Sequence, residues 1–373
     1  MNTGSSSAGY MAQLDGLRAI AVTAVVLFHW MPEVKQTGLG GLGVQLFFVL
    51  SGYLISGILV DARNKADRIG AGKGQIIKSF YARRFLRIFP LYYLVVVAAY
   101  FLGSTQIQDN FAWHLGYLTN ILIFIKGQWI GEASHLWSLA VEEQFYIFWP
   151  FVMLFTPRRY LSATVIGFIL LAPAFKLTYF FSGIEESRLG VLPISSFHYL
   201  GAGALLAMME RSDKFRHDAQ WRNTVTFTIK VAGVIGFFVF ALLQLFPLFL
   251  SVFPALAVVR EFGLILLFIS ITMGAAFGFK GLAGRFLSAK PMLFIGQISY
   301  GLYLVHNFIP YFTNKLLRDS LDLRIDSHLL LLINSSVLLV LCSILYHFFE
   351  RPLNKYKNNF PYVLASSKAE VHS

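Results

Sequence analysis

The sequence has little charge and almost no cysteine. Only 13% of its 373 residues are charged, and 56% are hydrophobic. Because a soluble domain is about a quarter charged, this composition excludes a soluble enzyme with a single membrane anchor. The one cysteine, Cys342, lies in an apolar run. A lone cysteine excludes an intramolecular disulfide and a cysteine-based metal cluster.

The signatures of several enzyme classes are also missing. No set of His, Cys, Asp and Glu has the spacing of metal ligands, so no metal is expected. The glycine-rich loops of P-loop and dinucleotide-binding domains are absent, and so is the Ser-centred nucleophile elbow of hydrolases. No internal repeat supports the architecture of an inverted-repeat transporter. Any chemistry must therefore come from polar side chains placed singly within apolar segments.

Apolar runs of about 20 residues recur along the whole sequence, and each is long enough to span a bilayer. We therefore predict an all-α, polytopic membrane helical bundle with about ten transmembrane helices. The first is predicted to be a retained helix, because Asp15 and Arg18 stand at its start and no cleavage site follows. The predicted ranges are 11–31, 44–60, 80–102, 136–156, 160–181, 197–210, 223–245, 256–279, 292–313 and 328–349.

Two connecting segments have a distinct composition. Residues 38–43 form a glycine-rich run that predicts a short loop before the second helix. The stretch 104–134 is mixed, and its apolar part, Trp113 to Ile125, is short for a membrane span. We predict a re-entrant or interfacial segment there, and a spanning arrangement stays open.

The net charge of +12 is unevenly distributed. With a cytoplasmic N-terminus, the ten predicted helices put 22 of the 31 Lys and Arg on the inner side. Such a bias follows the positive-inside rule and predicts that both termini are cytoplasmic, in the cell inner (plasma) membrane. The net charge is then explained by topology and by contact with lipid headgroups, so no nucleic-acid partner is expected. The predicted organisation is a disordered N-terminus over 1–10, a membrane domain over 11–355 and a cytoplasmic tail over 356–373.

The first predicted helix carries a polar stripe. Arg18 and His29 are eleven residues apart, close to three helical turns, so they share one face at roughly 16 Å along the axis. Asp15 stands one turn before Arg18 on the same stripe. A histidine within a membrane helix is costly without a partner or a task. His29 is either held by a polar neighbour or the interface beside Trp30, or is a general base for a hydroxyl acceptor; we favour the base.

A second cluster is basic. Arg83 and Arg84 precede Arg87 by four and three residues, so the three guanidinium groups crowd one helix face at the predicted inner end. Headgroup binding is one interpretation. The other is a site for a phosphorylated ligand, because the guanidinium fork matches phosphate oxygens.

Two further segments place polar groups in apolar surroundings. Glu142 and Glu143 stand more than a turn inside a predicted helix, beyond where a helix N-terminus favours negative charge. Ser138 and Tyr146 share the face of Glu142. A carboxylate at this place is suited to orienting an imidazole or binding a sugar hydroxyl. Tyr300, Tyr303 and His306 are spaced by three residues and form another polar stripe. In a later segment His347 and Glu350 precede Pro352, and this proline favours a helix stop.

Together these segments resemble one family. The sequence is similar to the acyltransferase family 3 membrane proteins, which include bacterial O-acetyltransferases of cell-surface glycans. The resemblance covers about residues 11–355. It rests on LDGLRAIAVTAVVLFH at 14–29, FFVLSGYLI at 47–55, FYARRFLRIFPLYY at 80–93, LWSLAVEEQFY at 136–146, ISYGLYLVH at 298–306 and FFERP at 348–352.

The resemblance implies a reaction and its partners. The family's Arg-x10-His element falls on Arg18 and His29, and its Arg-x-x-Arg element on Arg84 and Arg87. It implies acyl-CoA, usually acetyl-CoA, as a cytoplasmic co-substrate with no permanently bound cofactor. The acceptor is a hydroxyl of a glycan or lipid-linked saccharide at the outer side of the bilayer. Some members add a helix and a C-terminal SGNH domain, and this sequence, which stops at Ser373, is expected to lack both.

The expected roles combine the residue patterns with this resemblance. A direct transfer with His29 as general base is favoured, and an acyl-enzyme on His29 stays open. The competing class is a saccharide or lipid transporter or flippase. The predicted site comprises catalytic His29, Glu142 and Glu143; donor-binding Arg18, Arg83, Arg84 and Arg87; and acceptor or supporting Asp15, Trp137, Ser138, Tyr146, Tyr303 and His306.

Overall fold

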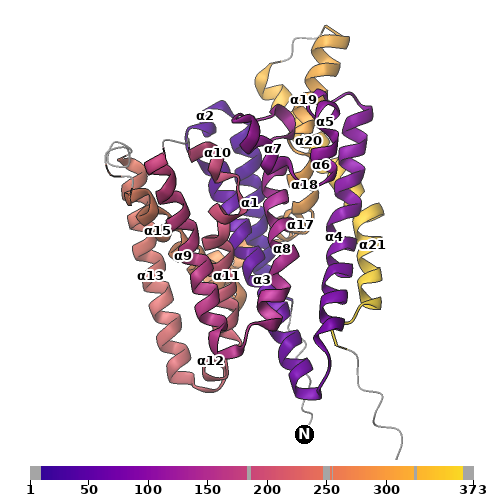
Figure 1. Ribbon diagram of the computed structural model, residues 1–373. Helices are drawn as coiled ribbons and strands as arrows, with labels where there is room; N and C mark the ends of the chain where they lie inside the picture. The colour runs from indigo at the N-terminus through magenta and orange to yellow at the C-terminus, as the bar shows by residue number, and fades with distance from the viewer. Residues whose placement is uncertain (1–9, 183–185, 247–252, 254, 323–325, 364–373) are drawn as a thin grey trace, which may run out of the picture.

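The computed structural model describes residues 10–182, 186–246, 253, 255–322 and 326–363, which form helices joined by short turns and no strand (Figure 1). By length and composition, seven helical segments in this part of the chain are suited to cross a membrane. This confirms an all-α, multi-pass membrane fold, while the count of ten and the sides of the termini stay predictions. Each of the seven segments starts with a different long helix. These helices are α1 (Ala12–Trp30), α3 (Leu39–Ile69), α4 (Lys73–Phe101), α9 (Arg158–Ser182), α13 (Ala219–Leu245), α15 (Ala255–Phe277) and α20 (Ser327–Leu345).

Shorter helices complete the bundle. α8 (Leu136–Phe155) and α11 (Phe197–Glu210) agree with their predicted ranges and bury most of their residues. Of the connecting helices, α2 (Pro32–Lys35) and α10 (Glu186–Gly190) lie at the upper end in Figure 1, and α12 (Asp213–His217) lies at the lower end.

The second predicted helix is much longer than expected. α3 begins at Leu39, directly after Gly38 with φ +72°, so most of the predicted glycine-rich loop is helical. It continues to Ile69, and α4 begins at Lys73, so the basic residues between positions 61 and 87 lie on these two helices. The predicted range was too short because it followed hydropathy. Charged residues extend α3 beyond the length that a bilayer requires, and their hydropathy is low.

The ninth predicted helix, over 292–313, is broken. It consists of α17 (Lys290–Gln297), α18 (Ser299–Val305) and α19 (Phe308–Asn314), followed by a π-helical turn, η3 (Lys315–Ser320). The breaks leave backbone carbonyl groups free to bond with side chains instead of with the next helical turn. Tyr303 and Leu304 use their carbonyl groups in this way.

The predicted helix stop at Pro352 is wrong. α20 passes into a π-helical turn, η4 (Tyr346–Glu350), and α21 (Arg351–Lys355) then contains the proline in its first turn. The chain therefore remains helical through Pro352.

The segment 104–134 forms only short pieces. They are α5 (Thr105–Asp109), α6 (Phe111–Leu115), α7 (Thr119–Lys126) and η1 (Gly131–Ala133). The longest has eight residues, well below the length of a membrane span. The structure therefore agrees with a re-entrant or interfacial segment and not with a spanning one.

One end of the bundle collects the segments that the sequence assigns to the cytoplasm. Here Arg158, at the start of α9, pairs with Asp67 at 2.7 Å, and Arg211 pairs with Asp61 at 2.8 Å. This is the lower end in Figure 1, where α12 lies. The predicted positive side is thus a single face, and its cytoplasmic location remains a prediction.

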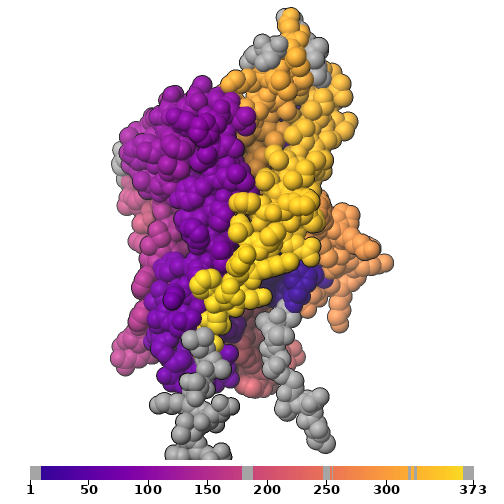
Figure 2. Space-filling view, turned by 90° about the vertical axis from the view of Figure 1, so that its right-hand side faces the viewer, coloured from indigo at the N-terminus to yellow at the C-terminus, as the bar shows by residue number. Residues whose placement is uncertain are grey.

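The C-terminal segment lies beside α4, as Figure 2 shows for the yellow and purple surfaces. Ser79 donates a hydrogen bond to the carbonyl oxygen of Pro361 at 2.7 Å. Residues 356–363 are therefore packed on the bundle rather than forming a free tail. The remaining tail residues, 364–373, lie outside the described residues, as do residues 1–9 of the segment 1–10 that was predicted to be disordered. Tyr10, the last residue of that segment, is described and bonds to Asp15.

Close contact between α3 and α11 fixes the centre of the bundle. A Cβ atom at Gly52 would lie 1.9 Å from the Leu200 carbonyl oxygen, and one at Gly203 would lie 2.0 Å from that of Val49. Small residues permit such approach between membrane helices. Gly52 therefore holds its neighbours Ser51 and Tyr53 in place, and both make inter-helix bonds, to Glu142 and to Glu210 at 2.6 Å.

We expect Gly52→Leu to destabilise the protein, because its side chain would collide with the backbone of α11. Overpacking costs about 1–3 kcal/mol and more where the backbone must move. Thermal unfolding in detergent measures the effect. Gly167→Leu is the matched control, because a Cβ at Gly167 in α9 has no heavy atom within 4 Å. Equal melting temperatures for both variants would contradict this packing role.

Candidate active site

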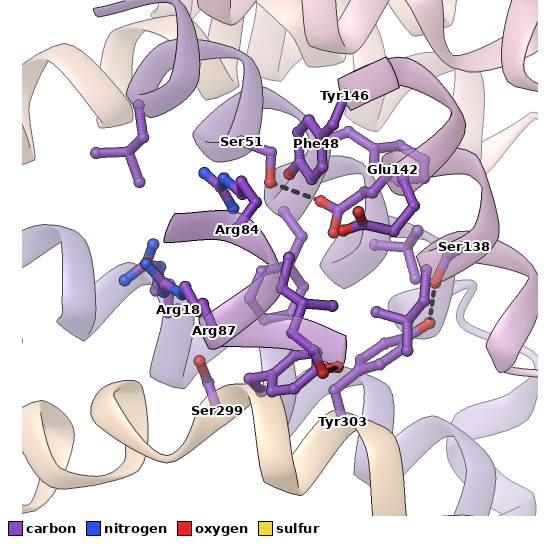
Figure 3. A pocket seen from close by; sticks show the side chains of 17 residues that line it. Arg18, Phe48, Ser51, Arg84, Arg87, Ser138, Glu142, Tyr146, Ser299 and Tyr303 are labelled. Atoms are coloured by element: carbon purple, nitrogen blue, oxygen red, sulfur yellow. Dashed lines mark hydrogen bonds between the residues drawn. The ribbon is translucent and has the colours of Figure 1, made fainter. Parts of the chain in front are cut away.

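A pocket with about 760 Å³ of empty space lies inside the bundle between α1, α3, α4, α8 and α18 (Figure 3). We call it the arginine pocket. Its lining comes from segments up to 285 positions apart, which only the folded bundle brings together. The lining residues are Arg18, Val44, Phe47, Phe48, Ser51, Leu54, Arg84, Arg87, Ile88, Ser138, Leu139, Glu142, Glu143, Tyr146, Ser299, Tyr300 and Tyr303.

Three guanidinium groups lie on one side of the arginine pocket, those of Arg18, Arg84 and Arg87 (Figure 3). Arg84 lies over the ring of Tyr146, with 4.7 Å between its Cζ atom and the ring centroid. Neither Arg84 nor Arg87 forms a hydrogen bond or ion pair with another described residue. Their N–H donors are therefore available to an anion in the pocket.

Arg18 is held by an acidic partner. It donates a hydrogen bond to Asp15 at 2.9 Å, and the hydroxyl group of Tyr10 donates to the same carboxylate at 2.5 Å. Gly296 of α17 packs directly on this turn, since its Cβ would lie 2.0 Å from the Asp15 carbonyl oxygen. Asp15 itself does not line the pocket, so it supports Arg18 rather than an acceptor.

Arg83 faces away from the arginine pocket, unlike its two neighbours. Its guanidinium group donates to the carbonyl oxygen of Phe360 at 3.2 Å and lies 4.9 Å from the centroid of the Tyr362 ring. Arg83 therefore does not line the pocket, and its contacts give no support to its predicted donor-binding role. Arg83 ties α4 to the C-terminal segment instead.

The opposite side of the arginine pocket is acidic (Figure 3). Both Glu142 and Glu143 line it, and the hydroxyl group of Ser51 donates to Glu142 at 2.6 Å. Neither carboxylate bonds to His29. A role of Glu142 in orienting the imidazole therefore has no support in the contacts, whereas a carboxylate facing bound substrate agrees with them.

Three histidines form a cluster next to the arginine pocket, which we call the histidine cluster. The ring centroids of His29 and His306 are 4.9 Å apart, and those of His306 and His135 are 4.8 Å apart. His306 and His135 are buried, while His29 is half-buried. Trp30 also anchors this region, since its indole N–H donates to the His306 carbonyl oxygen.

The hydrogen bonds of the histidine cluster define which ring nitrogen is free. Nδ1 of His29 lies 2.8 Å from the carbonyl oxygen of Val25, and Nδ1 of His306 lies 2.6 Å from that of Tyr303. A carbonyl oxygen only accepts, so both Nδ1 atoms carry protons. The Nε2 atom of His306 then accepts from Nδ1 of His29 at 3.3 Å. His135 faces carbonyl oxygens at both nitrogens, from Glu132 and Leu304. Within the described residues, Nε2 of His29 alone has no partner in this cluster.

Tyr303 connects the arginine pocket with the histidine cluster. Its hydroxyl group lines the pocket, lies 2.5 Å from that of Ser138 and donates to the His135 carbonyl oxygen at 3.2 Å. Its ring centroid is 5.5 Å from that of His306. Tyr303 therefore lies between the arginine pocket and the histidine cluster that contains His29.

The remaining predicted residues differ in whether they line the arginine pocket. Ser138, Tyr146 and Tyr303 line the arginine pocket as expected for supporting groups. Trp137 does not line it and faces a second cavity. The described residues contain no group of three His, Cys, Asp or Glu arranged to hold a metal ion.

Two members of the site were not selected from the sequence. Ser51 lies within the FFVLSGYLI segment, and His135 directly precedes LWSLAVEEQFY. A polar residue inside an apolar membrane segment is itself a signal of function, and this rule would have selected Ser51. His135 follows Ser134 and precedes the predicted helix 136–156, so the rule does not select it.

The fold and the site together define a multi-pass membrane protein with a basic pocket beside a histidine cluster. Residues 11–358 match the family described as Acyltransferase domain, acyltransferase family 3, so the chain belongs to this family. This confirms the predicted family and the predicted enzyme class, an acyltransferase.

The curated relatives include peptidoglycan O-acetyltransferases. The O-acetyltransferase OatA of Staphylococcus aureus (strain NCTC 8325 / PS 47) is 28% identical over 326 residues, covering 82% of this chain and 51% of the relative. The peptidoglycan O-acetyltransferase OatA of Listeria monocytogenes serovar 1/2a is 28% identical, with coverages of 80% and 49%. The putative peptidoglycan O-acetyltransferase YrhL of Bacillus subtilis (strain 168) is 28% identical, with coverages of 92% and 55%. The chain thus spans about half the length of these relatives, and no solved structure matches it.

Proposed function

We propose that this protein is an inner-membrane O-acetyltransferase that moves an acetyl group from cytoplasmic acetyl-CoA to a hydroxyl of a cell-surface glycan. The relatives' names point to peptidoglycan as the acceptor. The observation that carries the proposal is the unpaired guanidinium groups of Arg84 and Arg87 in one pocket, linked through Tyr303 to His29. An anionic donor and a proton-abstracting base are the two requirements of this reaction.

The donor is proposed to occupy the arginine pocket. Arg84 and Arg87 would hold phosphate oxygens of coenzyme A, because paired guanidinium donors fit phosphates. Arg18 adds positive charge and is fixed by Asp15. The acyl thioester would then extend past Tyr303 toward the histidine cluster.

The reaction is proposed to be a direct transfer. Nε2 of His29 takes the proton of the acceptor hydroxyl, and the resulting oxygen attacks the thioester carbonyl carbon. The C–S bond then breaks, the acyl group stays on the acceptor oxygen, and the coenzyme A sulfur receives a proton. The Val25 carbonyl oxygen fixes the tautomer of His29 by accepting its Nδ1 hydrogen bond, and Nε2 of His306 is a second acceptor for the same N–H. Transfer through an acyl group on His29 uses the same nitrogen and differs only in a covalent intermediate.

A saccharide or lipid transporter is the competing proposal, because buried polar groups also line transport paths. The unpaired arginine pair favours the acyltransferase over a transporter of neutral saccharides, since a neutral saccharide gives these two cations no partner. Acetyl-CoA hydrolysis or transfer by the purified protein separates the two classes.

The proposed reaction crosses the membrane, and this gives its test. Arg18 and His29 are separated by roughly 16 Å along α1, and Arg18 is nearer the basic end. We expect labelled acetyl-CoA added outside sealed inside-out vesicles to acetylate peptidoglycan strands enclosed in the lumen. Right-side-out vesicles given the same external donor should transfer nothing, because their donor site faces inward.

The side of each loop is checked separately in the same vesicles. Cysteine introduced at Lys73 should react from the cytoplasmic side and cysteine at Asp322 from the opposite side. Equal labelling in both vesicle orientations, or labelling confined to strands on the cytoplasmic side, would rule out the transmembrane path.

A further inference from the structure

Two further cavities lie at the end of the bundle where α2 and α10 lie, which is the upper end in Figure 1. They have about 500 and 960 Å³ of empty space and share Gly41, Gln45, Tyr199, Arg260 and Glu261. Because they share these residues, the two cavities are neighbours, and we call them together the outer cavity and each one a lobe of it. The proposed reaction leaves this space unused.

Charged groups meet where the lobes join. Lys176 and His198 both contact the Glu261 carboxylate, His198 at 3.2 Å, and all three side chains are largely buried. This ion-paired cluster fixes the carboxylate at the cavity wall. Arg260 bonds to the Gln244 amide oxygen at 3.4 Å and faces both lobes. Buried charges that line a cavity in a membrane protein mark a ligand path or site.

Aromatic rings form the other wall of the larger lobe. Trp129 and Trp137 line it with ring centroids 6.4 Å apart, and Trp129 is 53% exposed. Indole faces combined with fixed carboxylate, amide and guanidinium groups suit a ligand with apolar C–H faces and many hydroxyl groups. A saccharide has both properties.

The outer cavity adjoins the arginine pocket. Val44 and Phe48 line both spaces, and the Phe48 ring contacts that of Trp137 with centroids 6.2 Å apart. Ser138, directly after Trp137, lines the arginine pocket. A ligand in the outer cavity therefore lies one side chain away from the donor pocket, on the side opposite the basic end.

We propose that the outer cavity is the acceptor site and binds an extended saccharide of more than one sugar ring, with Trp129 stacking on a ring and Arg260 and Glu261 bonding its polar groups. The inference rests on the proposed function and deepens it. The two lobes favour an oligosaccharide over a single sugar, since one ring would occupy only one lobe. A tryptophan that merely anchors the protein at the membrane surface would require neither the second lobe nor the fixed charges.

Filling the cavity provides the first test. A Cβ at Gly41 meets no heavy atom within 4 Å, and Gln45, one turn along the same face of α3, lines both lobes. We expect Gly41→Phe to raise the KM for peptidoglycan strands at least tenfold while leaving acetyl-CoA hydrolysis unchanged. Gly167→Phe is the matched control, since Gly167 is equally open but lies on α9 away from both lobes.

The outcomes separate this inference from the proposed function. If the wild-type protein acetylates no strand, the proposed function fails. If it acetylates strands and Gly41→Phe matches Gly167→Phe in KM, the acceptor site is wrong although the function stands. Loss of acetyl-CoA hydrolysis in Gly41→Phe would also count against it, because the substitution would then act on the donor.

Tryptophan fluorescence gives an independent readout that does not depend on turnover. Titration with peptidoglycan strands should change the emission of the wild-type protein, and Trp129→Phe should remove most of this change. Trp221→Phe should retain it, because Trp221 stacks against Lys214 beside α12 at the other end of the bundle. A change that survives in Trp129→Phe would overturn the proposed stacking contact.

Discussion

His29→Ala is expected to reduce acetyl transfer by about 10²–10⁴-fold, the usual contribution of a general base. The expectation rests on one atom. Nε2 of His29 is the ring nitrogen of the histidine cluster that has no partner among the described residues, because Nδ1 is engaged by Val25 and His306. Steady-state transfer by the purified protein, compared at equal amounts of folded material, measures the loss.

Two further variants separate chemistry from folding. His347→Ala is the matched control, because the Nδ1 atom of His347 bonds to the carbonyl oxygen four residues earlier, Ser343, just as His29 bonds to Val25, but on an exposed surface. It should transfer acetyl groups at the normal rate. His29→Gln keeps polarity without a comparable base and should be as impaired as His29→Ala. Near-normal transfer by a well-folded His29→Ala protein would remove His29 from the mechanism.

The same geometry assigns His306 a positioning role. Its Nε2 atom accepts the hydrogen bond of His29, and its own Nδ1 is held by the Tyr303 carbonyl oxygen. Its location in the broken region between α18 and α19 explains this arrangement, since the carbonyl group of Tyr303 is turned toward a side chain.

Much of this architecture follows from local sequence. The predicted range 197–210 coincides with α11, and those of α1 and α8 agree within one residue at each end. These helices have clear apolar runs bounded by polar residues, so hydropathy is sufficient. The spacing of Arg84 and Arg87 likewise predicted a shared site, and the fold brings both to one pocket together with Arg18.

Other features depend on contacts that no local pattern contains. The broken helix over 290–314 is as apolar as its neighbours, and its breaks are stabilised by bonds such as that from His135 to Leu304, 169 positions away. Arg83 and Arg84 are adjacent and chemically identical, yet the C-terminal segment engages the first and leaves the second facing the pocket. Only the path of the chain after Lys355 distinguishes them.

Arg83 consequently provides the control for a second prediction, which concerns coenzyme A binding by Arg84 and Arg87. We expect Arg84→Ala and Arg87→Ala each to weaken coenzyme A binding by about 10–150-fold, because a charge-assisted hydrogen bond contributes roughly 1.5–3 kcal/mol. Arg83→Ala should bind coenzyme A normally, although its loss of the Phe360 contact should lower thermal stability. Calorimetric titration of the detergent-purified variants with coenzyme A measures the dissociation constants directly.

Replacement by lysine refines the interpretation of the arginine pair. Lysine retains the charge but lacks the planar fork, so Arg84→Lys and Arg87→Lys should recover only part of the lost affinity. Arg84 also lies over the Tyr146 ring, a contact that favours guanidinium over ammonium. Full recovery by lysine at both positions would show that net charge alone attracts the donor. Wild-type affinity in both alanine variants would make these arginines headgroup anchors, and the donor would then have to bind elsewhere.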